Sequence, residues 1–197
     1  MKVGNISVLL VVLVLFGTCA YAADCNNGGR YEINVTTGTV TDCRTGLIWL
    51  QNAACTDTSG GIANPNGYLN WYDAMKWVAG LGSGLCGLND GSAVGDWRLP
   101  TKTEWMAMIQ SAKNQNISEP TLTNGDGTAK WVAGNAFNNV QPSGDYWSST
   151  TNANDTSHAW DVYLGSGSVI NLNKSSNFYV WPVRGGQSGS FGSLFIQ

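Results

Sequence analysis

The chain has 197 residues and a formal net charge of -3 at neutral pH, and only 12% of its residues are charged. This weakly acidic balance argues against nucleic acid or an anionic membrane as the main partner, because both are negatively charged. The 25 glycines and 9 tryptophans predict many turns around a core built on indole rings.

The N-terminus carries the three parts of a secretory signal peptide. Lys2 supplies a positive charge, residues 8–16 form an unbroken apolar run, and Ala20-Tyr21-Ala22 fits a cleavage site. The run is shorter than the roughly 20 residues that span a bilayer. The weaker interpretations are that the apolar run forms a buried strand or an anchor helix, or that Cys19 carries a lipid. We predict a signal peptide over residues 1–22, a secreted, periplasmic or cell-surface location, and no membrane insertion after cleavage.

Signal cleavage would leave residues 23–197 as one domain, with a core over about 30–186 and a Gly/Ser-rich tail over 187–197. It removes one of the 10 basic residues and none of the 13 acidic residues, so the net charge moves from -3 to -4. The remaining sequence shows no internal repeat of fixed period and no convincing second domain.

Four cysteines remain after cleavage removes Cys19, and an even number predicts two disulfides in an exported chain. Three connectivities are open, and chain order favours Cys25–Cys43 and Cys55–Cys86 because each pairing closes a local loop. Each loop would contribute roughly 3–4 kcal/mol in the chain-entropy model. No C-x-x-C motif is present, which argues against a zinc site, and we expect no metal and no cofactor.

The first structured segments are short strands between turn-forming residues. Residues 39–42 and 46–50 combine β-branched and aromatic side chains and predict two strands. An N-terminal loop over 24–30, which Cys25 would tether, precedes them. A loop rich in Gly, Ser, Asn and Pro follows over 56–67.

Two amphipathic helices are the clearest local predictions. Asn70 can cap the first, which we expect to end at Gly82, and Thr101 with Glu104 forms a capping box for the second. In each helix, apolar residues follow i, i+3, i+4, i+7 spacing, which indicates a face packed in the core rather than a cofactor contact. These faces are Trp71, Ala74, Met75 and Val78, then Trp105, Met108, Ile109 and Ala112.

The polar stretch 114–141 contains the segment NGDGT at 124–128. It lacks the series of carboxylates and the distal Glu of an EF-hand loop, so a tight turn is favoured over a calcium site.

The C-terminal half is rich in predicted strands, at 146–149, 158–164, 168–173 and 178–184. In the second of these, alternation places His158 and Trp160 on one face and Asp161 on the other. Pro182 interrupts the last strand, which we expect to lie at an edge or to end there. Two helices combined with twisted, mostly antiparallel strands predict an α+β domain.

A series of motifs resembles a known family. In chain order they are DCRTGLIW at 42–49, CGL at 86–88, GDWRLPT at 95–101, YWSST at 146–150, AW at 159–160 and VWPVRGG at 180–186. Together they are similar to the Lcl C-terminal domain family, long a bacterial domain of unknown function, over most of the mature chain. The resemblance implies a C-type-lectin-like fold of the formylglycine-generating-enzyme type, and it also implies that Cys55 pairs with Cys86.

The named member of that family is a collagen-like surface adhesin whose terminal domain binds glycosaminoglycans. The resemblance therefore implies a bacterial surface or periplasmic binding module. This sequence contains no collagen-like Gly-x-y stalk, so a trimeric architecture does not carry over. Its acidic balance also weakens an interpretation as a binder of sulfated glycans, because the mature lysines form no cluster. They are Lys76, Lys102, Lys113, Lys130 and Lys174.

Aromatic and basic residues inside the motifs are interpreted as structural. Arg98 and Arg184 would hold loops together by bonding carbonyls and carboxylates such as Asp96 or Glu104. Buried indoles commonly dominate a core, so core positions are favoured over ligand platforms for Trp97, Trp147, Trp160 and Trp181.

The candidate ligand surface is a polar rim in the C-terminal half. Neutral amides and hydroxyls among aromatic rings suit a hydroxyl-rich ligand or a protein surface, and the alternative is a solvated hairpin that binds nothing. The predicted rim residues are Asn152, Asn154, Asp155, Thr156, His158, Tyr163, Asn171, Asn173, Lys174, Asn177 and Tyr179.

Catalytic motifs are not recognisable. His158 is the single histidine, no G-x-S-x-G sequence occurs, and no pair of carboxylates stands out. We therefore predict a noncatalytic module that binds a glycan or a cell-surface protein. The alternative is a structural or assembly module of the bacterial envelope with no diffusible ligand.

Overall fold

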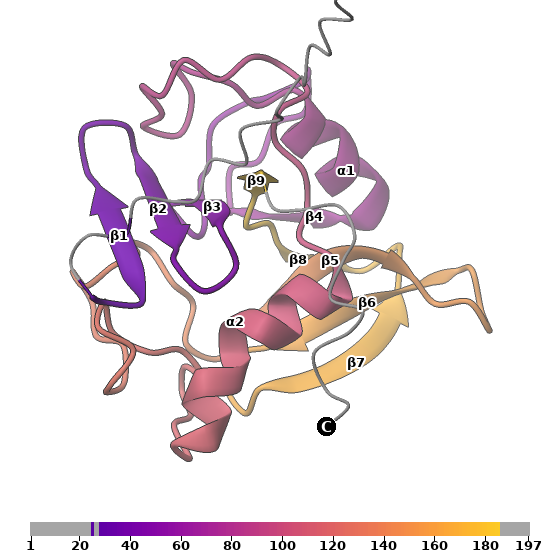
Figure 1. The fold of residues 1–197 in the computed structure, drawn as a ribbon. Coiled ribbons are helices and arrows are strands. Elements are labelled where there is room, and N and C mark those ends of the chain that lie inside the picture. The colour runs from indigo at the N-terminus through magenta and orange to yellow at the C-terminus, as the bar shows by residue number, and fades with distance from the viewer. Residues whose placement is uncertain (1–24, 26–27, 186–197) are drawn as a thin grey trace, which may run out of the picture.

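The computed structural model describes residue 25 and residues 28–185. The predicted signal peptide, its cleavage site and the tail over 187–197 therefore lie outside the described residues. Two helices and nine strands in this part confirm the predicted α+β class. The strands form two sheets, one at the left of the molecule and one beneath and behind helix α2 (Figure 1).

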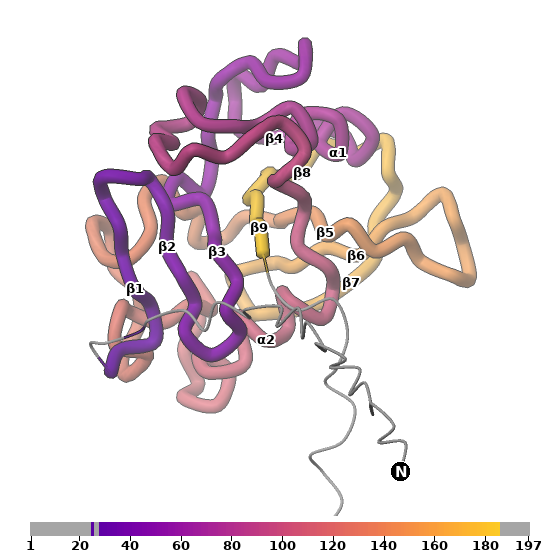
Figure 2. Tube along the Cα trace, turned by 45° about the horizontal axis from the view of Figure 1, so that its top comes forward, coloured from indigo at the N-terminus to yellow at the C-terminus, as the bar shows by residue number. Residues whose placement is uncertain are grey.

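The first sheet has four antiparallel strands in the order β1-β2-β3-β9. Figure 2 shows β1, β2 and β3 side by side, with β9 next to β3. The predicted strands at 39–42 and 46–50 are confirmed as β2 and β3, whereas β1 was not predicted. The four strands are β1 (Tyr31–Asn34), β2 (Thr39–Asp42), β3 (Leu47–Leu50) and β9 (Val183–Gly185).

The second sheet has five strands in the order β4-β8-β5-β6-β7. Its pairs are antiparallel except for β5 with β8, which run parallel. It contains the three other C-terminal strands predicted from the sequence. The five strands are β4 (Tyr68–Asn70), β5 (Asp145–Thr151), β6 (His158–Tyr163), β7 (Ser168–Asn173) and β8 (Asn177–Tyr179).

The prediction of one strand over 178–184 was wrong. The segment divides into β8 and β9, and these belong to different sheets. Pro182 lies between them and has no N–H to donate, while its carbonyl accepts a 3.0 Å hydrogen bond from the Leu50 N–H. The chain thus crosses from one sheet to the other at the proline. β8 is an inner strand, and β9 lies at the edge of its sheet.

Both predicted helices are present. α1 spans Trp71–Ala79 and α2 spans Lys102–Asn114, and both predicted N-caps are confirmed, including the full capping box of α2. α1 ends before Gly82, with Gly80 as its C-cap. A Cβ on Gly80 would collide with the Gly60 backbone, so this glycine allows the helix end to pack against the preceding loop.

The core is a cluster of aromatic rings between the two sheets and α2. Trp49, Trp105 and Trp181 contact one another at ring-centroid distances of 5.1–5.8 Å, and Tyr146 packs against Trp105 at 5.6 Å. Indole N–H groups also bond strand backbone: Trp181 donates to the Leu50 carbonyl at 2.8 Å. Hydrogen-bonded indoles therefore fix the sheets relative to each other while filling the core.

The structure contains both disulfides favoured by chain order, Cys25–Cys43 and Cys55–Cys86, which span 18 and 31 residues of sequence. The predicted turn at 124–128 is also confirmed, because Asn124 accepts from the Gly127 N–H at 3.0 Å through its carbonyl. Across the described residues, we find no helix with the length and apolar character needed to cross a membrane.

Candidate functional site

The structure brings most of the predicted rim together where β6 begins and β7 ends. His158 lies directly opposite Asn173 in the β6–β7 pair. The Asn152 amide donates to the Asn171 side-chain oxygen at 3.1 Å, which joins the loop before β6 to β7. We call this surface the hairpin rim. It comprises Asn152, Asn154, Asp155, Thr156, His158, Asn171 and Asn173, with Asn177 following the adjacent turn into β8.

Side-chain oxygens shape the turns of the hairpin rim. Asn152 Oδ1 accepts from the Asn154 N–H at 3.1 Å, and Asn173 Oδ1 accepts from the Ser175 N–H at 2.9 Å. Asp155 Oδ1 accepts from the Ser157 N–H and hydroxyl at 3.0 and 2.6 Å. The Ser157 hydrogen bonds hold the pKa of Asp155 below its usual value. Such local bonds are the reason that Asn and Asp favour turns.

Three predicted rim residues lie elsewhere. Tyr163 ends β6, five strand steps or roughly 17 Å from His158. Tyr179 packs against the rings of Tyr68 and Tyr146 at centroid distances of 5.8 and 5.4 Å. Lys174 is only 6% exposed, and its ammonium donates to Thr151 Oγ1 at 2.8 Å. The structure therefore places Tyr163 and Tyr179 away from the hairpin rim and engages the Lys174 charge inside the fold.

Trp160 differs from the other motif tryptophans. Trp97, Trp147 and Trp181 are buried as predicted, whereas Trp160 is half-buried. It lies directly opposite Asn171, and the Lys102 ammonium sits 3.0 Å from its ring centroid. The core interpretation was therefore incomplete for Trp160. The alternation along 158–164, which puts it on the His158 face, was the available sequence signal.

The single histidine has serine and aspartate neighbours. His158 Nδ1 lies 2.7 Å from Asp155 Oδ2 and 3.0 Å from Ser157 Oγ. A catalytic triad uses the two ring nitrogens separately, one for the nucleophile and one for the orienting carboxylate. Here both partners contact Nδ1, and all three residues lie within one short turn. This arrangement caps the turn and differs from the geometry of a catalytic triad.

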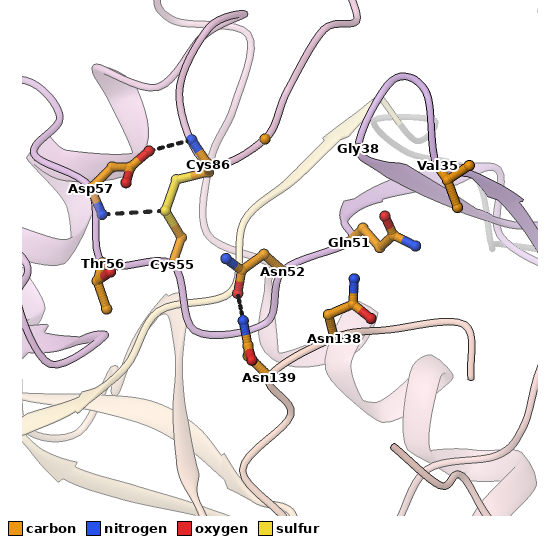
Figure 3. A pocket seen from close by; sticks show the side chains of 11 residues that line it. Val35, Gly38, Gln51, Asn52, Cys55, Thr56, Asp57, Cys86, Asn138 and Asn139 are labelled. Carbon is orange, nitrogen blue, oxygen red and sulfur yellow. Dashed lines mark hydrogen bonds between the residues drawn. A yellow bond between two sulfur atoms is a disulfide. The ribbon is translucent and has the colours of Figure 1, made fainter. Parts of the chain in front are cut away.

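A second polar surface surrounds a pocket of about 380 Å³ beside the Cys55–Cys86 disulfide (Figure 3). We call it the amide cleft, because the side chains of Gln51, Asn52, Asn138 and Asn139 line it. None of the predicted rim residues belongs to this lining. Sequence reasoning missed the cleft because its walls come from four separated segments, and no single segment carries a binding motif.

The cleft also contains the one cluster of potential metal ligands found in the described part of the chain. Cys55, Asp57 and Cys86 place one ligand atom each within 4.8 Å of the others. Both sulfurs belong to a disulfide, so neither is a thiolate that could bind a metal. The Asp57 carboxylate instead accepts a 2.6 Å hydrogen bond from the Cys86 N–H. The cluster is therefore a structural wall of the cleft.

Beneath the hairpin rim, β6 carries a buried acid. Asp161 is fully buried opposite Trp147 and Ile170, and a side-chain hydrogen bond joins its carboxyl group to that of Asp145. Burial, and secondarily the nearby Asp145 charge, raises the pKa of Asp161 to about 8. The Asp145–Asp161 pair therefore keeps a proton at neutral pH.

The chain was also compared with models of known protein families and with curated proteins. The model of the family described as the Lcl C-terminal domain matches residues 38–184, which is most of the chain. The chain belongs to this family. The match includes every residue of the hairpin rim and of both helices. No curated protein matches the chain. Membership in the Lcl C-terminal domain family and two disulfides are together consistent with an extracellular domain.

Two arginines in the motifs of this Lcl C-terminal domain hold loops, as predicted. Arg98 forms two charge-assisted bonds with Glu104 at 2.7 and 2.6 Å. Burial alone would raise the pKa of Glu104, but the bonds from Arg98 and Thr101 outweigh it and lower that pKa. Arg184 pairs with Asp90 at 3.1 Å, a partner that the sequence did not indicate.

Proposed function

We propose that this Lcl C-terminal domain is a noncatalytic extracytoplasmic module that binds a glycan or a cell-surface protein through the hairpin rim. The observation that carries the proposal is a half-buried indole ring beside side-chain amides that still have hydrogen-bonding groups available. Trp160 faces Asn171 across the β6–β7 pair, and Asn171 bonds Asn152. Aromatic rings combined with small amides are typical of surfaces that recognise sugars and protein loops.

The hydrogen-bonding capacity of the rim supports this role. A side-chain amide can donate two hydrogen bonds and accept two. The Asn152–Asn171 bond uses one donor of Asn152 and one acceptor of Asn171, so both amides keep groups for a ligand. Because turn bonds already order the loop before β6, a ligand would meet a pre-organised surface and lose less entropy on binding.

The charge around Trp160 favours a ligand of mixed or low charge. Lys102 lies over the ring, while Asp155 and His158 form a pair within the same rim. A heavily sulfated chain needs a cluster of cations, and within the described residues Lys102 is the one cation that contacts the Trp160 ring. The turn-capping geometry of His158 also supports a role in binding rather than catalysis.

A structural or assembly role in the envelope is the second candidate. A groove of about 320 Å³ runs between α2 and β7, and its lining includes Met106 and Ile109. Met106 is 45% exposed, and an exposed apolar side chain flanked by lysines suits a protein partner. Under this alternative, substitutions in the groove would disturb assembly, and substitutions in the hairpin rim would leave it unchanged.

The mature, oxidised protein on a glycan array, together with a pull-down from cell-surface extracts, tests the proposal. We expect specific retention of a glycan or a surface protein, and loss of that retention in Trp160→Ala and Asn171→Ala. The matched control is Asn66→Ala, because Asn66 is exposed and its side chain makes no hydrogen bond within the described residues. Retention of nothing in both assays would contradict the proposal.

A further inference from the structure

The amide cleft lies on the opposite flank of the domain from the hairpin rim. Its walls come from the turn between β1 and β2, the segment after β3, the Cys55–Cys86 disulfide and residues 138–139. In Figure 1 the β1–β2 turn is at the upper left, whereas the loop joining β5 to β6 is at the far right. A ligand in the cleft would therefore not contact the hairpin rim.

The walls of the cleft are held by backbone and covalent bonds. The Asn138 N–H donates to the Gln51 carbonyl at 2.9 Å, and the Gln51 N–H donates to the Gly38 carbonyl at 3.0 Å. Gly38 has a positive φ of 71°, and a Cβ there would collide with the Gly87 carbonyl. Two loops thus contact each other directly through backbone. This rigidity is typical of a preformed small-molecule site.

Two amides in the cleft are free to bind. Figure 3 shows the Gln51 and Asn138 side chains as neighbours in the cleft, while Asn52 and Asn139 bond each other at 3.0 Å. Within the described part of the chain, no hydrogen bond engages the amide of Gln51 or that of Asn138. Each amide offers donors and acceptors, which together match the paired hydroxyls of a sugar ring.

The charge of the cleft favours an uncharged ligand over an anionic one. Asp57 is the one ionisable side chain in the lining, and no lysine or arginine is among the lining residues. The Asp57 carboxylate accepts a hydrogen bond from the Cys86 N–H at 2.6 Å, so this acid stabilises the wall of the cleft. An apolar edge is supplied by Val35, which is 75% exposed. A volume of about 380 Å³ lies at the small end of ligand sites.

From these observations we infer that the amide cleft is a second, independent binding site that takes the terminal unit of an uncharged saccharide. Gln51 and Asn138 bond its hydroxyls, Val35 contacts its apolar edge, and the absence of cationic lining residues discriminates against sulfated or carboxylated sugars. The inference does not depend on what the hairpin rim binds, since the two surfaces share no residue.

Nuclear magnetic resonance titration of the oxidised, mature protein tests the inference. The probes are three uncharged disaccharides, N,N′-diacetylchitobiose, lactose and maltose, and one sulfated heparin disaccharide. We expect at least one uncharged probe to shift the side-chain amide resonances of Gln51 and Asn138, while the heparin disaccharide leaves them in place. Unmoved cleft amides with all three uncharged probes, or shifts with the sulfated probe alone, would overturn the inference.

Variants separate the cleft from the hairpin rim. Gln51→Ala and Asn138→Ala should each weaken binding of the active disaccharide about tenfold, or about 1.4 kcal/mol, because each removes hydrogen bonds to the sugar hydroxyls. Asn171→Ala in the rim and Asn66→Ala should leave its affinity unchanged. A loss of affinity in Asn171→Ala with no loss in Asn138→Ala would place the saccharide in the rim and refute the cleft site. If the glycan array and the pull-down retain nothing, while the resonances of Gln51 and Asn138 still shift with an uncharged disaccharide, only the proposed role of the rim would be refuted.

Discussion

The amide cleft and the hairpin rim use the same residue type in different ways. In the rim, the side-chain oxygens of Asn152 and Asn173 accept from backbone N–H groups and shape the turns. In the cleft, a disulfide and backbone bonds between loops shape the walls, and the amides of Gln51 and Asn138 make no hydrogen bond within the described residues. In the rim, side chains therefore shape the surface through local bonds, whereas in the cleft long-range bonds shape it.

Removing the disulfide of the cleft should give the largest change in stability, because long-range bonds frame the cleft. Replacing Cys55 and Cys86 by serine should lower the free energy of unfolding by about 4 kcal/mol, as the chain-entropy model gives for a loop of this size. The bond closes 31 residues of sequence. Urea denaturation of the two proteins measures the loss. The matched pair is Cys25→Ser with Cys43→Ser, which opens a span of 18 residues and should cost about 3 kcal/mol. An unchanged midpoint in the first variant would contradict the framing role of the disulfide.

Close backbone contact in the cleft predicts a second effect. Gly38 and Gly46 have nearly equal positive φ values of 71° and 70°. A Cβ on Gly38 would collide with Gly87, whereas a Cβ on Gly46 would meet nothing within 4 Å. Gly46→Ala should therefore cost only the conformational strain, about 1–2 kcal/mol. Gly38→Ala should cost a further 1–3 kcal/mol or so for the forced shift. Equal losses in thermal denaturation would show that the two loops do not constrain each other.

The rim side is supported by a strand whose buried acid makes stability depend on pH. The pKa of Asp161 rises from 3.8 to about 8 on folding, so the folded chain keeps a proton that the unfolded chain releases. Stability should therefore fall as the pH rises from about 4 toward 8, by at most about 1.4 kcal/mol per pH unit. Asp161→Asn should flatten this profile in urea denaturation between pH 5 and pH 8. A variant profile as steep as that of the wild type would assign the dependence to another group.

The smallest expected effect separates the two kinds of asparagine. Asn173→Ala removes the acceptor of the Ser175 N–H and hydroxyl and should lower the free energy of unfolding by about 1 kcal/mol. Asn138→Ala removes no bond of the described structure and should change stability by less than about 0.5 kcal/mol. Thermal denaturation of both variants checks the difference. The comparison between cleft and rim fails if Asn138→Ala is the more destabilising of the two.

Local signals in the sequence were sufficient for much of the fold. The Thr101–Glu104 capping box determines where α2 begins, and spacing along the helix identified its buried face. Chain order was enough to pair the cysteines. The division of 178–184 was not predictable in the same way. Pro182 signalled an interruption, but only the contact of its carbonyl with Leu50 places the following residues in a different sheet.

The two candidate sites also differ in how far local sequence signals could predict them. Most of the hairpin rim comes from two adjacent turns, so a polar pattern in one region of sequence could predict it. Long-range packing removed Lys174 and Tyr179 from that surface, because Trp71 lies under the lysine and Tyr68 and Tyr146 flank the tyrosine. The amide cleft could not be predicted, since Gln51 and Asn138 meet only through tertiary structure.

Parallel glycan-array and pull-down measurements on the wild type, Asn171→Ala and Asn138→Ala test the central claim most directly, namely that the hairpin rim recognises an extracytoplasmic ligand. We predict that the wild type and Asn138→Ala both retain at least one glycan or surface protein that Asn171→Ala loses, whereas a saccharide held by the amide cleft is weakened by Asn138→Ala and not by Asn171→Ala. Equal retention by all three proteins, or retention by none, would contradict the account.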